Sequence, residues 1–428
     1  MIEKILSDLI KIKSVNPPGG EMEVAKYLQE LFDREDIENE IIESDKDRGN
    51  FLAYLGDGKK RLLLLSHTDV VPAEERSWDF DPFSGEIGDG FVYGRGALDC
   101  KDLVAAEANA MIQLKRKGIK LEGKLIFAAT ADEEKGGEIG VGYLVKNHLN
   151  KIKADFAINE GAGFPIQVNG KRIYLVQTGE KGIAWSKLKT KGKSVHGSMP
   201  SLGENAVVKM AEAVSKISKY QPEIVLIPEV KTLIESLAKL KGFSVEVNPE
   251  NVDLILSQFP KEKKVFTESL RAVTRMTLSP NIIKGGLKTN IVPDFCEAEV
   301  DIRVLPSQSE EFVKNELEKI LGDDVEIEIP AYHKASNSPA GTSFYKLIEK
   351  TIRELVPDVL CLPFYLTGAT DSKFLRSKGI PSYGFSPASK DFDLNLIETI
   401  HGKNERIDIE SLKLKTQFLE RIAERYLS

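Results

Sequence analysis

The chain has 428 residues, of which 41% are hydrophobic and 29% are charged. This composition is typical of a globular protein of about two to three domains, and it argues against disorder, a collagen-like fibre or a coiled coil. Lys and Arg number 59 against 66 Asp and Glu, a net charge of -7, so no overall basic surface favours nucleic acid or an anionic membrane. No apolar stretch approaches a membrane span. Three widely spaced cysteines fit a reducing compartment. We expect a cytoplasmic protein.

The N-terminal part of the chain alternates helical and strand patterns. The first 14 residues form an amphipathic helix pattern rather than a signal peptide. Short apolar strands separated by helices predict a largely parallel sheet that is buried on both faces. The predicted elements are a helix over 23–32, a strand over 61–69, a helix over 103–117, and strands over 124–130 and 154–161.

The pattern changes between about 180 and 330 to the order β-α-β-β-α-β, which predicts a ferredoxin-like unit. A segment at about 219–270, rich in Pro, Lys and Glu, interrupts this unit as an insertion. The α/β pattern resumes after about 331. We therefore predict a discontinuous α/β catalytic domain over 1–179 and 331–428, with a mostly parallel central sheet flanked by helices, and an inserted α+β domain over 180–330.

Two short motifs could carry chemistry at the ends of these elements. His67 and Asp69 follow a run of four leucines and share one face of an extended segment, so the carboxylate could orient a metal-binding imidazole. A polar turn at the end of a strand explains this pair equally well. Asp99 follows a glycine-punctuated turn and precedes a long helix, where it could be an N-terminal cap or a carboxylate that bridges two cations.

Three further strand ends or loops carry acids or histidine. Adjacent acids at Asp132, Glu133 and Glu134 repel one another unless cations or solvent neutralise them, and a solvated acidic loop is the alternative. Glu160 ends another strand, and His401 lies near the C-terminus. Together these segments offer two histidines and at least three carboxylates, a set of N and O ligands that suits zinc, manganese or cobalt. A hydrolytic site with two metal ions explains the set economically.

The predicted inserted domain contributes a further histidine, His196, in a Gly/Ser turn, and later Asn290 and Arg303. A lone strand arginine usually forms a salt bridge, but a guanidinium also binds a substrate carboxylate in a bidentate manner. His148 and His333 have no acidic motif beside them and are interpreted as surface histidines.

Taken in order, the motifs of this chain resemble those of one known family. The family comprises zinc-dependent aminoacylases, acetylornithine deacetylases, succinyl-diaminopimelate desuccinylases and glutamate carboxypeptidases, and the resemblance runs from about residue 60 to 408. The motifs that carry it are SHTDVVP, WDFDPFSGEIGDGFVYGRGALDCKD, ATADEEKGG, INEGAG, SVHGSMP, KTNIVP, DIRV, TGATDS and HGKNERI.

The resemblance implies a centre of two divalent metal ions, zinc by expectation, with cobalt or manganese as alternatives. It implies that His67 and Glu160 bind one ion, that Glu134 and His401 bind the other, and that Asp99 bridges them. The fold that it implies is a di-metal catalytic domain with an inserted lid and dimerisation domain.

The same resemblance implies three catalytic roles. Asp69 orients a metal-binding histidine, and Glu133 is the general base that activates water and returns the proton to the leaving amine. His196 would reach the active site of a partner subunit and stabilise the oxyanion, which requires a homodimer formed through the lid domain.

Substrate contacts are implied at four residues: Asn290 and Arg303 on the lid, and Gly368 and Thr370 in a loop of the catalytic domain. Departures from the family pattern include Cys100 beside the predicted bridging aspartate, the insertion at 219–270 and Asn159 where many relatives have Asp. Glu160 favours the deacylase and carboxypeptidase branches over the aminopeptidases.

The predicted function is hydrolysis of the amide bond of an N-acyl amino acid. A dipeptidase or carboxypeptidase of the same family is the nearest alternative. A non-catalytic metal-binding or scaffold protein is a distant one, because such proteins usually lose ligands or the base and none is missing here. The expected partners are a small N-acyl amino acid or short peptide and a second copy of the chain, without nucleic acid or membrane.

Overall fold

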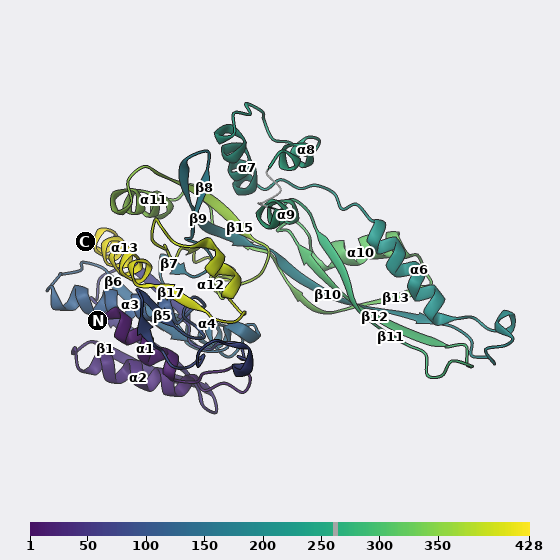
Figure 1. Cartoon of the computed structure of the whole chain (residues 1–428), viewed down its shortest axis with the longest axis horizontal. Coiled ribbons are helices and arrows are strands. Elements are labelled where there is room, and N and C mark those ends of the chain that lie inside the picture. The colour runs from purple at the N-terminus through teal and green to yellow at the C-terminus, as the bar shows by residue number, and fades with distance from the viewer. Residues whose placement is uncertain (260–263) are drawn as a thin grey trace.

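The computed structural model describes residues 1–259 and 264–428. A large body is built around a 10-stranded sheet, and an elongated arm is built around a 4-stranded sheet (Figure 1). Both chain termini lie in the body. Residues 260–263 belong to the insertion predicted at about 219–270 and lie outside the described residues.

The sheet of the body has a parallel centre, as predicted. Strands β6, β3, β7 and β16 lie side by side and parallel, whereas β1, β2 and most partners of β9 pair in the antiparallel direction, so the sheet as a whole is mixed. Its strands are β1 (Glu38–Asp45), β2 (Arg48–Leu55), β3 (Arg61–His67), β6 (Lys124–Thr130), β7 (Phe156–Asn159), β8 (Pro165–Val168), β9 (Lys171–Glu180), β14 (Ser336–Asn337), β15 (Val359–Leu366) and β16 (Ser382–Gly384).

Helices cover both faces of this sheet. Side chains alternate along a strand, so Leu62 and Leu64 of β3 join one core and Leu63 and Leu65 join the other. The apolar run of β3 is therefore buried on both sides. The first core includes α1 (Ile2–Lys11), α2 (Glu21–Asp33), α3 (Lys101–Arg116), α11 (Ser343–Leu355) and α13 (Ile409–Leu427), and the second includes α4 (Val141–Asn147), α5 (Leu149–Ile152) and α12 (Ser372–Ser377).

The arm has the predicted β-α-β-β-α-β order. Its strands lie in the order β11-β12-β10-β13 with antiparallel neighbours, which is the ferredoxin-like arrangement. Strand β10 leaves the body, so the loop that follows β10 lies at the outer end of the arm (Figure 1). The elements are β10 (Gly182–Lys191), α6 (Ala206–Lys219), β11 (Thr277–Gly285), β12 (Phe295–Val304), α10 (Glu310–Leu321) and β13 (Val325–His333).

Three helices in the described part of the predicted insertion pack on the body. Helices α7 (Pro228–Leu240), α8 (Val252–Ser257) and α9 (Lys264–Ala272) share a core with β8, β9 and β15. Leu237 of α7 and Leu270 of α9 are buried there with Leu175 of β9 and Leu362 of β15. The segment thus lies where the arm joins the body (Figure 1).

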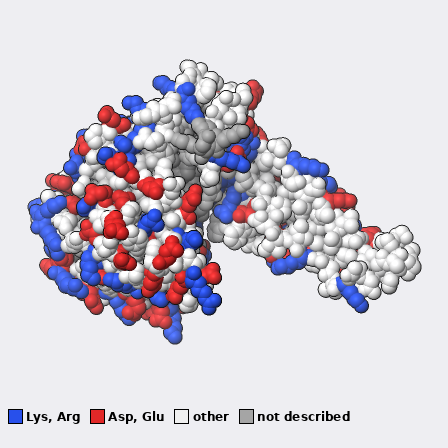
Figure 2. All heavy atoms as spheres, viewed as in Figure 1, with Lys and Arg blue, Asp and Glu red and all other residues white. Residues whose placement is uncertain are grey.

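A small sheet of β4 (Ile87–Gly88), β5 (Phe91–Tyr93) and β17 (Arg406–Asp408) connects two distant parts of the body. Short 3-10 helices complete the fold at η1 (Glu75–Ser77), η2 (Glu133–Lys135), η3 (Pro200–Leu202) and η5 (Leu394–Thr399). Figure 2 shows acidic and basic side chains interspersed over the visible face of the body and mostly uncharged ones at the outer end of the arm. Among the described residues, no helix combines the length and hydropathy needed to cross a membrane.

Candidate metal centre

The candidate centre forms where β3, β6 and β7 end at the same edge of the sheet. His67 is the last residue of β3 and stands opposite Thr130, the last residue of β6. Glu133 and Glu134 follow β6 in η2, and Glu160 follows β7 directly. Because these strands are parallel, their carboxyl ends bring together groups that lie far apart in the sequence, which is where open α/β sheets bind ligands.

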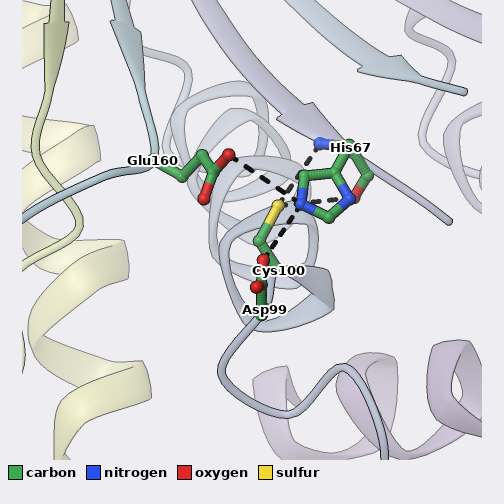
Figure 3. Close-up of side chains that lie close together, drawn as sticks. All are labelled: His67, Asp99, Cys100 and Glu160. Atoms are coloured by element: carbon green, nitrogen blue, oxygen red, sulfur yellow. Dashed lines mark hydrogen bonds and ion pairs between the residues drawn. The ribbon is translucent and has the colours of Figure 1, made fainter. Parts of the chain in front are cut away.

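His67, Asp99, Cys100 and Glu160 form a first group of potential ligands. Each offers one ligand atom, and these atoms lie within 4.8 Å of one another. His67 Nε2 lies 3.0 Å from Asp99 Oδ1 and 3.9 Å from Glu160 Oε1. Figure 3 shows these side chains converging from β3, from the loop before α3 and from the end of β7.

Asp99, Glu134 and His401 form a second group, whose ligand atoms also lie within 4.8 Å of one another. His401 Nε2 lies 3.1 Å from Asp99 Oδ2 and 3.1 Å from Glu134 Oε2. Asp99 belongs to both groups and turns a different carboxylate oxygen to each histidine. The residue that the sequence predicts as a bridging carboxylate is thus the one that the two groups share.

Glu405 anchors the loop that carries Asp99. Its carboxylate accepts hydrogen bonds from the backbone N–H of Leu98 at 2.7 Å and of Asp99 at 3.1 Å, and it pairs with Arg95 Nη1 at 2.6 Å. Gly96 allows the tight turn, because its φ is +89° and a Cβ there would lie 2.9 Å from a methyl group of Val70. The glycine-rich turn noted in the sequence thus serves to place Asp99.

His401 lies in a sharply turned segment. Its φ is 56°, a region that residues other than glycine rarely adopt, and the carbonyl of the next residue, Gly402, accepts a hydrogen bond from Arg95 Nη2 at 2.7 Å. Its side chain is 52% exposed, so His401 is the solvent-exposed member of the second group.

Asp69 supports both strand ends. The ring nitrogen His67 Nδ1 lies 3.0 Å from the Asp69 carbonyl oxygen and 3.4 Å from its Oδ1. The same carboxylate accepts hydrogen bonds from the backbone N–H of Glu133 at 3.1 Å and of Glu134 at 3.2 Å. Asp69 therefore fixes the ring of His67 and the start of η2 together.

Opposing effects govern the ionisation of the buried acids. Burial raises the pKa of Glu160 to about 8, with repulsion from Asp99 as a further cause. Burial also raises the pKa of Glu133 well above its usual range, and the charge of Glu160 adds to this effect. Burial acts in the same direction on Asp99, but hydrogen bonds to His401 and His67 outweigh it and lower the pKa of Asp99.

The residues present fit divalent cations. Carboxylates crowd around two imidazoles, and repulsion among the carboxylates adds to the raised pKa values of Glu160 and Glu133. Bound cations would relieve this repulsion. Imidazole nitrogen with carboxylate oxygen is a suitable ligand set for zinc and its neighbours. Two overlapping groups that share Asp99 provide places for two ions.

Cys100 lies within the first group but is engaged with the protein backbone. The backbone N–H of His67 donates to Cys100 Sγ at 3.3 Å, and the thiol donates to the His67 carbonyl at 3.5 Å. Burial raises the pKa of the Cys100 thiol well above its usual range. These contacts describe a buried thiol that packs against the end of β3.

Residues His196 and Asn290 lie away from this centre on the same chain. They belong to adjacent segments, because the backbone N–H of Gly197 donates to the Asn290 carbonyl at 2.7 Å, and both are exposed. The loop after β10 that carries His196 is at the outer end of the arm (Figure 1). The structure therefore brings these two residues together but not to the ligands of their own chain.

Arg303 lies near the inner end of the arm, opposite Ile183 at the start of β10. It is half-buried and pairs with Asp301 through its Nε at 2.8 Å.

Thr370 is buried in the body, where its backbone N–H and hydroxyl donate to Glu180 Oε2 at 3.0 and 2.8 Å. Gly368 is half-buried two residues earlier in the same loop.

Sequence reasoning did not identify several residues that shape the site. Asn16 Nδ2 donates to Asp69 Oδ2 at 2.8 Å and to Asp132 Oδ1 at 3.2 Å. Asp371 is buried, burial raises its pKa to about 7, and its charge acts on Glu133. Glu405 was included in a motif but not as a supporting residue. The one sequence feature that could have pointed to Asn16 is its position, as a polar residue directly before Pro-Pro-Gly-Gly near the N-terminus.

Two curated proteins are similar to this chain over most of its length. The chain is 29% identical over 412 residues to the N-fatty-acyl-amino acid synthase/hydrolase PM20D1 of Xenopus tropicalis, covering 92% of this chain and 79% of that protein. It is 28% identical over 383 residues to a probable succinyl-diaminopimelate desuccinylase of Staphylococcus aureus strain MRSA252, covering 87% and 85%.

Solved structures share the fold. The M20 family metallo-carboxypeptidase Sso-CP2 from Sulfolobus solfataricus has a TM-score of 0.72 at 22% identity and covers 98% of each chain. A tripeptidase from Staphylococcus aureus has a TM-score of 0.68 at 19% identity. These likenesses confirm the predicted α/β fold class. The model of peptidase family M20/M25/M40 matches residues 63–425, so the chain belongs to this family and is a hydrolase.

Proposed function

We propose that the protein hydrolyses the amide bond of N-acyl amino acids with two divalent metal ions, zinc foremost. The observation that carries the proposal is the pair of ligand groups that share Asp99, with Glu133 close by in η2. The names of two similar relatives, a fatty-acyl-amino acid hydrolase and a probable desuccinylase, support an N-acyl amino acid as substrate.

In this proposal His67 and Glu160 would hold one ion, Glu134 and His401 would hold the other, and Asp99 would contribute to both sites. Ions bound there would polarise the scissile carbonyl and make water a better nucleophile at neutral pH. A set of two histidines and three carboxylates favours zinc, with cobalt and manganese as the other candidates.

Glu133 acts as the general base. It takes a proton from the attacking water and returns it to the leaving amine, so that one carboxyl group serves both half-steps. A raised pKa, caused by burial and by the charge of Glu160, suits this role because it makes the carboxylate a stronger base. Asp69 positions the base through the hydrogen bond from the Glu133 backbone N–H.

The substrate carboxylate is assigned to the inserted domain. Arg303 lies on β12 at the end of the arm nearest the body, and its guanidinium could exchange its contact with Asp301 for a bidentate contact with substrate. Asn290, which lies beside His196 at the outer end of the arm, would contact substrate in the site of the partner subunit, and the loop with Gly368 and Thr370 faces the substrate from the body. Glu180 fixes that loop through its two bonds from Thr370.

A homodimer formed through the arm accounts for His196. The outer arm exposes apolar side chains on β11 and the adjoining helix and loops, including Val208 and Ile283 at 52% and Leu287 at 98% exposure. An apolar edge strand is a ready surface for a second copy. In the dimer, His196 of one subunit reaches the site of the other and stabilises the oxyanion.

The domain division that goes with this function is a catalytic domain over 1–179 and 331–428 and a lid over 180–330. Buried thiols without disulfides at Cys100, Cys296 and Cys361 support a cytoplasmic location.

A substrate panel tests the proposed activity. Purified protein supplemented with zinc, cobalt or manganese is assayed against acetylornithine, succinyl-diaminopimelate, other N-acyl amino acids and dipeptides. We expect release of the free amino acid from at least one N-acyl substrate class. Cleavage of dipeptides alone would support the dipeptidase alternative, and no hydrolysis with full metal loading would contradict both.

A further inference from the structure

A cavity of about 620 Å³ extends from the candidate metal centre to the predicted insertion. Its lining includes Asp99 and Glu160 of the candidate centre and Val265, Phe266 and Ser269 of α9. Its volume is within the range of pockets that hold a small organic ligand, about 300–1,000 Å³. The cavity therefore connects the place of reaction with a segment that the proposed chemistry does not use.

The rest of the cavity lining is largely apolar. The body contributes Phe164, Leu175, Phe364 and Leu366, and η5 contributes Ile397. Aromatic and aliphatic surface of this kind gains by contact with an apolar ligand, because that contact removes it from water.

The wall formed by α9 is held in place. Leu270 is buried in the core that α9 shares with β9 and β15, and Arg271 and Arg275 both pair with Asp253 of α8 at 2.6 Å. Val265, in contrast, is 86% exposed on the same helix. A fixed helix that leaves an apolar side chain uncovered at a cavity is suited to an apolar occupant.

Charge distinguishes which half of an N-acyl amino acid fits this cavity. Of the residues that line it, Lys415 is the one cation, and its Nζ is already bound to Asp102 Oδ2 at 2.5 Å and to Ser386 Oγ at 2.7 Å. Glu398 on the lining repels a carboxylate. The amino-acid half of the substrate carries a free carboxylate, whereas the acyl half of a simple N-acyl compound carries no charge.

We propose that the enzyme selects substrates with a long apolar acyl chain, and that α9 forms the wall of the cavity that determines this specificity. The basis of the proposal is the apolar cavity whose lining includes Asp99 and Glu160 as well as Val265, Phe266 and Ser269 of α9. This inference rests on the proposed hydrolysis of N-acyl amino acids. It gives the segment at 219–270 a role in substrate selection.

The test compares kcat/KM for N-acetyl-, N-hexanoyl- and N-decanoylglycine with the metal-loaded enzyme. Each buried methylene favours binding by about fourfold, which corresponds to about 0.8 kcal/mol, so the decanoyl-to-acetyl ratio should be on the order of 100-fold or more. Ser269→Phe, which fills the cavity, should cut this ratio at least about tenfold. Phe266→Ala, which removes part of the wall, should lower the ratio as well.

Glu268→Phe is the matched control, because Glu268 is on the exposed side of the same helix and does not line the cavity. Its ratio should equal that of the wild type. Because the ratio compares two substrates on one preparation, partial unfolding of a variant does not change it. A second series, N-acetyl derivatives of glycine, leucine and phenylalanine, tests whether the cavity takes the amino-acid side chain instead.

Three results would overturn the inference while leaving the proposed activity intact. The first is a kcat/KM that does not change with acyl length, and the second is an equal decanoyl-to-acetyl ratio for Ser269→Phe and Glu268→Phe. The third is a selectivity that follows the amino-acid side chain and disappears in Ser269→Phe. If no N-acyl substrate is hydrolysed, the calorimetric affinities for decanoate and acetate test the acyl-chain cavity independently of the proposed activity. Tighter binding of decanoate that is lost in Ser269→Phe but kept in Glu268→Phe supports the cavity, and equal binding by all variants contradicts it.

Discussion

The carboxylate of Asp69 accepts a hydrogen bond from the backbone N–H of Glu133 at 3.1 Å. Through its carbonyl oxygen and Oδ1, the same residue lies within 3.0 and 3.4 Å of His67 Nδ1. One buried aspartate thus couples the orientation of a proposed metal ligand to the position of the proposed base. The arrangement explains why an acid stands two residues after the histidine, and it links the first and third motifs of the sequence.

Asp69→Asn should weaken the enzyme through both contacts. An amide nitrogen cannot accept the bonds from the η2 backbone and is a weaker partner for the His67 ring, so metal affinity or turnover should fall about 10- to 100-fold. Calorimetric metal titration and kcat/KM measure the two effects. Asp57→Asn, in an exposed loop, is the control, and an Asp69→Asn enzyme with wild-type values for both would contradict the coupling.

Glu405→Gln should loosen the loop that carries Asp99. Loss of one member of a buried ion pair costs about 3–5 kcal/mol, and Arg95 would be left without its partner at 2.6 Å. We expect a lower free energy of unfolding together with weaker binding of metal, measured by urea denaturation and titration. Glu410→Gln removes an exposed acid that pairs with Lys413 and should have little effect. Unchanged metal affinity in Glu405→Gln would show that Asp99 is held by other contacts.

The trans role of His196 predicts complementation between two inactive variants. His196→Ala and Glu133→Gln should each lose most activity as homodimers. In a mixed dimer, one of the two sites combines an intact base with an intact partner histidine, so the purified mixed dimer should recover about half of the wild-type activity. Co-expression with two affinity tags and assay of the doubly purified dimer measure this recovery. Inactive mixed dimers would place His196 outside the partner's site.

Titration of Lys181, which lies between the body and the arm, should make the free energy of unfolding depend on pH. Burial lowers the pKa of Lys181 to about 7, and Arg303 nearby acts in the same direction. In the unfolded chain this pKa is about 10.4, so between these values the unfolded state binds more protons and stability rises with pH. The contribution is fully present above the unfolded pKa and is lost as the pH falls through about 7.

Lys181→Met should therefore flatten this rise. The slope of the unfolding free energy against pH should fall by at most the contribution of one proton, about 1.36 kcal/mol per pH unit. Urea unfolding between about pH 7.5 and 9.5, inside the window set by the two pKa values, measures this slope. The variant also loses hydrogen bonds to the carbonyls of Ala272 and Arg275 at 2.8 Å, so it should be less stable throughout. Lys171→Met, exposed at the start of β9, should keep the wild-type slope.

Much of the fold could be predicted because its strongest patterns are local. The run of leucines in β3 and the amphipathic patterns of α2, α6 and α13 depend on burial that repeats along each element. Strands β1 and β9 were not predicted. Most of β1 is exposed or half-buried without strict alternation. Strand β9 ends in buried polar residues: Gln177 donates to Glu180, and Glu180 accepts hydrogen bonds from Thr370 in a distant segment. Such partners leave no periodic signal.

The ligand residues could be predicted for a different reason. His67, Asp99 and Glu160 stand at strand ends or in a glycine turn, and their residue types indicate metal chemistry when they occur together. Their supports Asn16 and Glu405 are ordinary polar residues in the sequence, and only the folded chain brings them within hydrogen-bond distance of Asp69 and Asp99. The cavity wall at α9 was equally hidden, because a helix in an insertion does not show what it faces.

The most direct measurement of the central claim compares Glu133→Gln with the wild type for bound metal and turnover on the same preparation. Removing the base should reduce kcat by about 10²- to 10⁴-fold while two divalent ions per chain remain bound by mass spectrometric analysis. Glu138→Gln, exposed in the same loop, should match the wild type in both. Near wild-type turnover by a fully loaded Glu133→Gln enzyme would contradict the account.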